Sequence, residues 1–329
     1  MSDRRLVLVV GVGRSGTSLL SGILGQLGLH IPKPEVRANR TNPRGFGEPR
    51  WVVDFHWRLL RERRVEVNDA RPSAWETMAG TAEDEAIRAE LRGWLSEQLS
   101  EHGAIVVKDP RTSWFLPLWM RCADELGVTP DFATMLRHPA ETVTSATQSY
   151  GTYLPAAARA GAWANVALGT ERATRGGRRV FARYEDLLTD WRREVTRMGE
   201  RLQLPQLAAI DPARAAGVDE FVDPALRRNR VGWEDLETPV PASLQAVVDT
   251  AWTRLQALTG RDGDAPATLA ALDETRAAYE RLYGDAEELA HSSIMARHAR
   301  QVAPPTFYMQ LARRVPRRYR KLIRRALRA

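Results

Sequence analysis

Short apolar runs recur along the N-terminal two thirds of the chain, and longer stretches with helical spacing separate them. The apolar runs are predicted to be strands: Leu6 to Val10, Ala104 to Val107, Phe132 to Leu136 and Val180 to Ala182. Strands that alternate with helices imply right-handed crossovers and a mainly parallel sheet covered on both faces. We therefore predict an α/β fold with three αβα layers around a central parallel sheet, followed by a helical C-terminal region. Ligands bind such sheets at the carboxyl ends of the strands.

Turn and cap residues set the expected segment boundaries. A helix is predicted from about Ala82 to Leu99, with Thr81 and Asp84 spaced like a capping box, and another begins near Pro139. Residues 30–49 hold four prolines and no regular period, which predicts a long loop. The pattern is irregular over residues 202–240 and helical again up to residue 301. We expect an α/β domain over 1–240, a helical extension over 241–303 and a basic amphipathic tail over 304–329.

Composition indicates a globular protein of a reducing compartment. Cys122 is the single cysteine, so the chain can form no internal disulfide and lacks the spacing of a cysteine-based zinc site. The opening apolar run is too short for a signal peptide or a spanning helix, and Arg14 follows it closely. We expect a cytoplasmic protein.

The basic charge of the chain is concentrated at its C-terminus. Residues 304–329 hold nine Lys or Arg and no acid, so the net charge of +7 leaves −2 for the remaining chain. Aromatic and aliphatic residues interleave with these charges, which is typical of an interfacial helix on anionic lipid. We expect peripheral contact with the inner membrane face. The alternative is a solvated tail that touches nucleic acid nonspecifically; no specific nucleic acid is expected.

A glycine-rich turn joins the first strand to the following helix, at Gly11 to Ser18. Such a turn directs backbone N–H groups and the positive helix end at an anion. A dinucleotide fingerprint would need a second strand ending in an acid, where this chain has His30 to Glu35. A Walker loop would need a lysine where Thr17 stands. The third interpretation is a cradle for one phosphate with a sulfuryl group, with Arg14 and the hydroxyls of Ser15, Thr17 and Ser18 as ligands. A purely structural glycine turn is the remaining alternative.

A second anion anchor is predicted at the end of the third strand. Arg137 follows this strand, and Ser145 lies eight residues later on the next helix, so both can converge on one phosphate. Taken alone, an arginine such as Arg137 is more often a surface or ion-paired residue.

The two anchors together resemble the sulfotransferase family, in which a G-x-x-R-S-G-T-S loop holds the 5′-phosphosulfate of 3′-phosphoadenosine 5′-phosphosulfate (PAPS) and an Arg-x7-Ser pair holds its 3′-phosphate. The chain looks most similar to bacterial sulfotransferases of envelope saccharides and glycolipids. The matching segments are Gly11 to Ser18, Asn42-Pro43-Arg44-Gly45-Phe46-Gly47-Glu48, Lys108-Asp109-Pro110-Arg111, Arg137 with Ser145, and Tyr184-Glu185-Asp186-Leu187. The resemblance covers residues 5–205 and implies a P-loop NTPase-like fold.

The resemblance also implies donor ligands. They are Gly13, Arg14, Ser15, Gly16, Thr17, Ser18, Arg137, Ser145 and the hydroxyl of Tyr184. A buried core tyrosine is the alternative for Tyr184. The R-K-G-x-x-G segment that closes over the donor in other family members is missing. Residues 226–230, before Trp233, are the candidate replacement, with Arg230 as its donor contact.

Sulfuryl transfer needs a base for the acceptor hydroxyl and cations for the leaving phosphate oxygen, and it demands no metal. Glu48 is the predicted base, with a helix N-terminal acid as its alternative role. His56 is the alternative base, because its ordinary pKa of about 6.5 suits the task. Lys108 and Arg14 are the predicted catalytic cations. For Lys108, an ion pair with neighbouring Asp109 or with another acid is the alternative.

The predicted function is transfer of a sulfuryl group from PAPS to a hydroxyl acceptor, a saccharide or glycolipid. Four of the ten tryptophans fall near the expected cleft and could stack on sugar rings: Trp51, Trp57, Trp75 and Trp114. Two other functions stay open. One is a small-molecule kinase on the same fold, and the other is a nonenzymatic module that binds nucleotides or polyanions.

Overall fold

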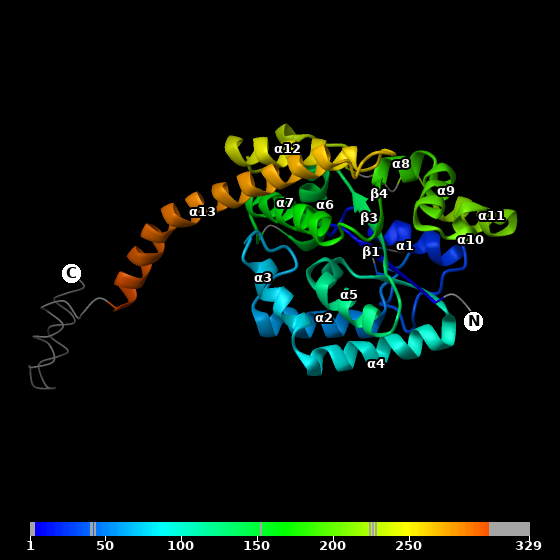
Figure 1. The fold of residues 1–329 in the computed structure, drawn as a ribbon. Coiled ribbons are helices and arrows are strands. Elements are labelled where there is room, and N and C mark those ends of the chain that lie inside the picture. The colour runs from blue at the N-terminus through cyan, green and yellow to red at the C-terminus, as the bar shows by residue number, and fades with distance from the viewer. Residues whose placement is uncertain are drawn as a thin grey trace, which may run out of the picture. The chain divides into compact units, whose positions relative to one another are not determined.

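The computed structural model describes residues 4–302, except 40, 41, 43, 152, 224, 226 and 228, and only the backbone of 296–302. Its sheet has four parallel strands in the order β2-β1-β3-β4 (Figure 1). The strands are β1 (Arg5–Val10), β2 (Ala104–Lys108), β3 (Asp131–Leu136) and β4 (Arg178–Arg183). The four predicted strands are thus confirmed, each longer by one to three residues. The sheet and its helices confirm the α/β fold class.

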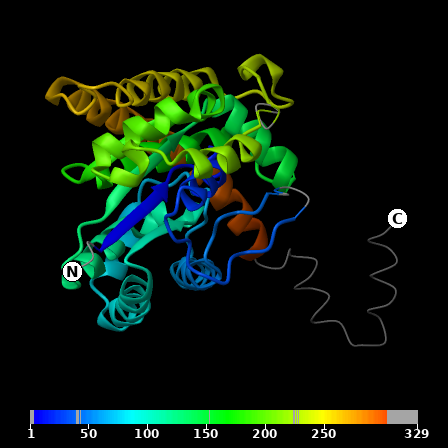
Figure 2. The same cartoon turned by 90° about the vertical axis from the view of Figure 1, so that its right-hand side faces the viewer.

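Helices cover both faces of the sheet. One group, α1 (Thr17–Gln26), α8 (Tyr184–Thr189), α9 (Trp191–Leu202), α10 (Pro205–Ala208) and α11 (Pro212–Phe221), lies on the right in Figure 1 and faces the viewer in Figure 2. The core beneath this group contains Val7, Val9, Val106, Ala133, Met135, Val180 and Ala182 from alternate strand positions. The intervening strand residues, such as Leu6 and Leu8, are fully buried as well. Strands buried on both faces explain why the sequence shows apolar runs instead of an alternating pattern.

The remaining described helices lie outside this group. They are α2 (Arg50–Arg63), α3 (Ala74–Ala79), α4 (Glu85–His102), α5 (Leu116–Glu125), α6 (Pro139–Tyr150), α7 (Ala156–Ala173), α12 (Ala242–Ala257) and α13 (Pro266–Val302). Three short 3₁₀-helices join them: η1 (Gly80–Ala82), η2 (Pro110–Phe115) and η4 (Trp233–Asp235). The predicted helix start at Pro139 is confirmed, and residues 30–49 form the long loop.

Two local predictions are wrong. The side chain of Asp84 accepts from the N–H groups of Ala86 and Ile87, so Asp84 itself is the N-cap of α4. Thr81 lies in η1, where its hydroxyl donates to the carbonyl of Met78, so the capping box does not form. The region 202–240 also contains α10 and α11, although it was expected to be irregular. Only two residues of α11 are buried, so its sequence shows almost no helical spacing of apolar residues from which the helix could be predicted.

The described chain divides into two compact units, with the boundary after Glu280. The α12 helix belongs to the first unit, where Trp252 lies 6.3 Å from Trp163 of α7, measured between ring centroids. The division at residues 240 and 303 stays a prediction, and the basic tail 304–329 lies outside the described residues. No helix of the described chain is long and apolar enough to cross a membrane.

Candidate functional site

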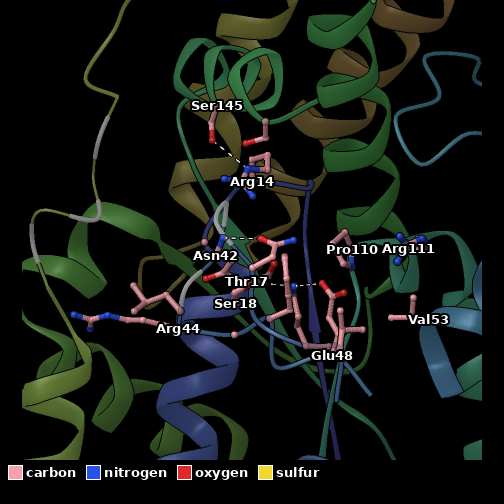
Figure 3. A pocket seen from close by; sticks show the side chains of 18 of the residues that line it. Arg14, Thr17, Ser18, Asn42, Arg44, Glu48, Val53, Pro110, Arg111 and Ser145 are labelled. Atoms are coloured by element: carbon pink, nitrogen blue, oxygen red, sulfur yellow. Dashed lines mark hydrogen bonds and ion pairs between the residues drawn. The ribbon is translucent and has the colours of Figure 1, made fainter. Parts of the chain in front are cut away.

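A cavity of about 630 Å³ opens at the carboxyl ends of the strands (Figure 3). Its lining comes from the turn after β1, the 30–49 loop, the start of α2, the segment after β2, and α6. The order of the strands places β1 between β2 and β3. Segments that follow β1, β2 and β3 therefore converge on one crevice, as expected for a sheet whose strand order reverses at this point.

The turn after β1 depends on two glycines and one strained arginine. Gly11 has φ 132°, and a Cβ there would lie 2.6 Å from the carbonyl of Met135. Gly16 has φ 96°, and its Cβ would lie 2.3 Å from the ring of Tyr184. Arg14 has φ 74°, which costs a residue with a side chain about 1–3 kcal/mol. No side chain caps α1 and no acid stands in its first turn, so its N-terminus is suited to an external anion.

Four of the predicted donor residues meet at the turn. The Nε of Arg14 donates to the hydroxyl of Ser145 at 3.1 Å, which Figure 3 shows as a dashed line. Arg137 donates through Nη1 to the carbonyl of Arg14 at 3.1 Å. Its guanidinium lies 4.7 Å over the ring of Tyr184, and its Nε donates to Glu141 at 3.0 Å. Among the described residues, Arg14 forms no ion pair, so the turn carries a cation without a counter-charge.

The segment before η4 contacts this group, but not through the predicted residue. Arg230 is exposed and is not among the residues that line the cavity. Asn229 lines it, accepts from Nη2 of Arg137 at 3.5 Å and donates to Gln148 at 3.2 Å. Arg227 pairs with Glu141 at 2.6 Å. The predicted lid segment thus reaches the cavity through Asn229, and the donor contact expected from Arg230 is not provided by this structure.

Two other predicted donor residues are turned away from the cavity. Ser15 is 1% exposed, and neither Ser15 nor Gly13 is among the lining residues. Gly16, Thr17 and Ser18 do line it. The hydroxyl contact expected from Ser15 is therefore not provided by this structure.

A buried ion pair stands on the β2 side of the turn. Lys108, the last residue of β2, donates to Oε1 of Glu48 at 2.5 Å and to the hydroxyl of Ser18 at 3.0 Å. Lys108 is 1% exposed and Glu48 is 7% exposed, and both line the cavity. Lys108 does not pair with Asp109 but with Glu48, so the alternative weighed for this lysine, an ion pair with Asp109 or another acid, is present in the structure. Glu48 lies two residues before α2, with its carboxylate on the lysine.

His56 does not reach the cavity. It is fully buried, its Nδ1–H donates to Asp109 at 2.7 Å, and its Nε2 accepts from the indole N–H of Trp119 at 3.0 Å. Since an indole can only donate, the ring is neutral with its proton on Nδ1. Burial lowers the pKa of His56. The alternative base is therefore a structural histidine, because α2 turns this position toward the core.

Most of the tryptophans are also structural. Trp51 stacks on Trp94 at 4.8 Å, and the indoles of Trp75 and Trp114 donate to backbone carbonyls. Trp57 alone among the four expected residues lines the cavity, and it is 40% exposed. The guanidinium of Arg111 lies 4.6 Å over its ring. Arg111 was visible in the sequence only as part of the Lys108–Arg111 segment, without a role.

Comparison with known proteins identifies the family of this chain. Residues 7–208 match the model of the sulfotransferase family, and because this is more than half of the chain, the protein belongs to that family. It is thus an enzyme of PAPS-dependent sulfuryl transfer. A similar solved structure is the sulfotransferase domain of the olefin synthase from Synechococcus PCC 7002. It is 18% identical, with 76% of this chain and 95% of that domain covered and a TM-score of 0.44. No curated protein matches the chain.

Proposed function

We propose that the cavity binds PAPS between the turn after β1 and Arg137, and that its sulfuryl group passes to the hydroxyl of a saccharide or glycolipid beside Glu48. The observation that carries this proposal is Arg14, which forms no ion pair with any described residue and lies against Ser145 and Arg137 on one side of the cavity. Guanidinium groups with free N–H edges bind phosphate and sulfate strongly. Arg137 and Ser145 would hold the 3′-phosphate. Arg14, predicted from the sequence as a catalytic cation, bonds to Ser145 and would join them there. The backbone of residues 16–18 would hold the 5′-phosphosulfate.

The transfer step uses the buried ion pair. The acceptor oxygen forms a bond to the donor sulfur while the bond from sulfur to the bridging phosphate oxygen breaks, and the electron pair stays on that oxygen. Glu48 takes the acceptor proton through Oε2, because Oε1 is held by Lys108. Lys108, which already reaches Ser18 of the turn, stabilises the negative charge on the leaving oxygen.

A saccharide or glycolipid acceptor is supported by the sequence resemblance and by Trp57, whose exposed ring offers a face to a sugar. A small-molecule kinase would use the same fold with ATP as its donor. In the described residues, no group of three or more metal-ligating side chains is present.

We also propose cytoplasmic location with peripheral membrane contact through residues 304–329, on the basis of their composition. Deletion of this tail should abolish flotation with vesicles that contain anionic lipid and leave donor binding intact. Unchanged flotation of the truncated protein would remove this proposal.

The donor proposal is tested by calorimetric titration with 3′-phosphoadenosine 5′-phosphate (PAP), ATP and NAD. Wild type should bind PAP selectively, and Arg137→Ala and Ser145→Ala should weaken PAP binding about ten- to hundredfold and a few-fold respectively. Arg58→Ala is the control, since Arg58 lies over a ring on α2 but outside the cavity. Thermal melts confirm that each variant folds. A preference for ATP, or no PAP binding, would contradict the proposal.

A further inference from the structure

The strand order separates the cavity into two ends. Arg137 follows β3, whereas Arg111 follows β2, and β1 lies between these strands. Neighbouring strands are about 4.8 Å apart, so the two arginines start about 10 Å apart. Lys108 ends β2 and reaches Ser18 at the start of α1, and its partner Glu48 comes from the 30–49 loop. In Figure 3, Arg111 lies beside Pro110 and Val53, away from Arg14 and Ser145. Arg111 is thus on the side of the transfer point where the donor phosphates are not expected.

Hydrogen bonds to Asp109 fix the position of Arg111. Its Nη1 and its backbone N–H both donate to Oδ1 of Asp109, at 2.5 and 3.2 Å. The other carboxylate oxygen of Asp109 accepts from His56, and Asp109 is fully buried. Burial opposes the charge of Asp109, but Arg111 and then His56 hold its pKa below its usual value. Asp109, itself held by His56, therefore orients the guanidinium of Arg111 but engages only part of its N–H groups.

One edge of this guanidinium is left without a partner. The Nε–H of Arg111 is shielded from water and has no acceptor in the described part of the chain. Asp109 engages only Nη1, so the edge formed by Nε and Nη2 remains, and this edge suits two oxygens of a carboxylate or phosphate. The ring of Trp57 covers one face of the guanidinium and is itself 40% exposed, so it can move to admit a ligand.

The lining of the cavity is predominantly cationic. Its described lining carries six cations and one acid; they are Arg14, Arg44, Arg50, Lys108, Arg111 and Arg137 against Glu48. Arg44 and Arg50 have carboxylates of Asp223 and Asp54 nearby, at 3.6 and 3.8 Å. Arg111 shares its only carboxylate with His56.

We infer that Arg111 and Trp57 form an acceptor subsite for an acidic saccharide, one that bears a carboxylate or phosphate near the hydroxyl to be sulfated. This inference rests on the proposed function. The sugar ring lies against the indole, and the oxyanion occupies the Nε–Nη2 edge of Arg111. The hydroxyl then faces Glu48.

The test is titration of the PAP-loaded enzyme with three matched probes: 4-nitrophenyl β-D-glucuronide, the 6-phosphate of 4-nitrophenyl β-D-glucoside, and the uncharged glucoside. At least one acidic probe should bind about tenfold or more tightly than the glucoside, because a charge-assisted pair is made only by the acid. The better acidic probe identifies carboxylate or phosphate as the group recognised.

Variants assign the preference to Arg111. Arg111→Gln should abolish the preference for acidic probes. Arg111→Lys should retain part of this preference, because lysine supplies the charge but not two parallel N–H donors. Trp57→Ala should weaken the binding of all three probes. Arg58→Gln is the control and should change nothing. Equal binding of acidic and neutral probes, binding of none, or a preference that survives in Arg111→Gln would overturn the inference. PAP titration of the same proteins separates this failure from failure of the donor site.

Discussion

Cationic side chains and carboxylates lie at both ends of the strands, but they are paired differently at the two ends. At the amino ends, Arg5 and Arg178 enclose the fully buried Asp131, with N–O distances of 2.7 Å to each of its oxygens. Arg5 also donates to the carbonyls of Leu202 and Gln203. Both carboxylate oxygens are engaged from the two sides, so this cluster is closed and ties β1, β3 and β4 together.

At the carboxyl ends, the cations are only partly satisfied. Arg14 bonds to a hydroxyl and forms no ion pair within the described chain, and Arg111 keeps an unpaired Nε. Lys108 is paired with Glu48, but both lie on a cavity wall. The comparison teaches that arginine–carboxylate pairing is complete at the amino ends, whereas the carboxyl ends keep N–H edges at which we propose that an anion binds. Substitutions at one end should therefore affect stability and those at the other end should affect chemistry.

The largest effect is expected at the open end, from Glu48→Gln. Loss of the base should lower the rate of sulfuryl transfer about 10²–10⁴-fold, since positioned acid–base groups contribute factors of this size. The affinity for PAP should stay within about threefold, because a neutral amide still accepts from Lys108. Single-turnover transfer of labelled sulfate from PAPS, with Glu62→Gln as the surface control, measures this. A normal rate in Glu48→Gln would assign the base to another group.

At the closed end, Asp131→Asn should lower the free energy of unfolding by about 3–5 kcal/mol, because it leaves two arginines partly buried without their carboxylate. Urea unfolding measures the change. At urea concentrations below the unfolding transition, the folded Asp131→Asn variant should bind PAP as the wild type does. If stability stayed normal while PAP binding fell, the contrast between the two ends would be wrong.

Gly16→Ala tests how closely the turn after β1 fits against the rest of the cavity. Its Cβ would meet the ring of Tyr184, which supports Arg137, so PAP binding should weaken about tenfold or more. Gly127→Ala is the matched control, since Gly127 has φ 67° with nothing within 4 Å of an added Cβ. It should lose stability from backbone strain alone and keep its PAP affinity. Equal affinity losses in both variants would mean that packing on Tyr184 is unimportant.

The sequence predicted the sheet well, because strands buried on both faces read as uninterrupted apolar runs. The glycine turn and Arg137 with Ser145 were also found, since strand ends place them by topology alone. The contacts of Asn229, the open edge of Arg111 and the burial of His56 were not predictable. Each depends on the path of a loop or the rotation of a helix, which long-range packing decides. Asp84 as a cap was misread because Thr81 offered the same local signal one turn earlier.

The smallest effect is expected at His56, which bonds to Asp109, the partner of Arg111. The unfolded chain takes up a proton on this ring near pH 6.5, about its ordinary pKa, whereas the folded ring resists protonation because burial lowers its pKa. Below about pH 6.5 the unfolded state therefore holds more protons, and the free energy of unfolding falls as the pH falls.

His56→Gln should be less stable than the wild type by about 1–3 kcal/mol near neutral pH, because it disrupts the bonds to Asp109 and Trp119. It lacks the titration, so from about pH 7.5 to about pH 5.5 it should lose roughly 1 kcal/mol less than the wild type. Urea unfolding at both pH values shows whether the two curves converge. Parallel curves would mean that the folded ring accepts a proton as easily as the unfolded one, and His56 would then return as a candidate acid–base group.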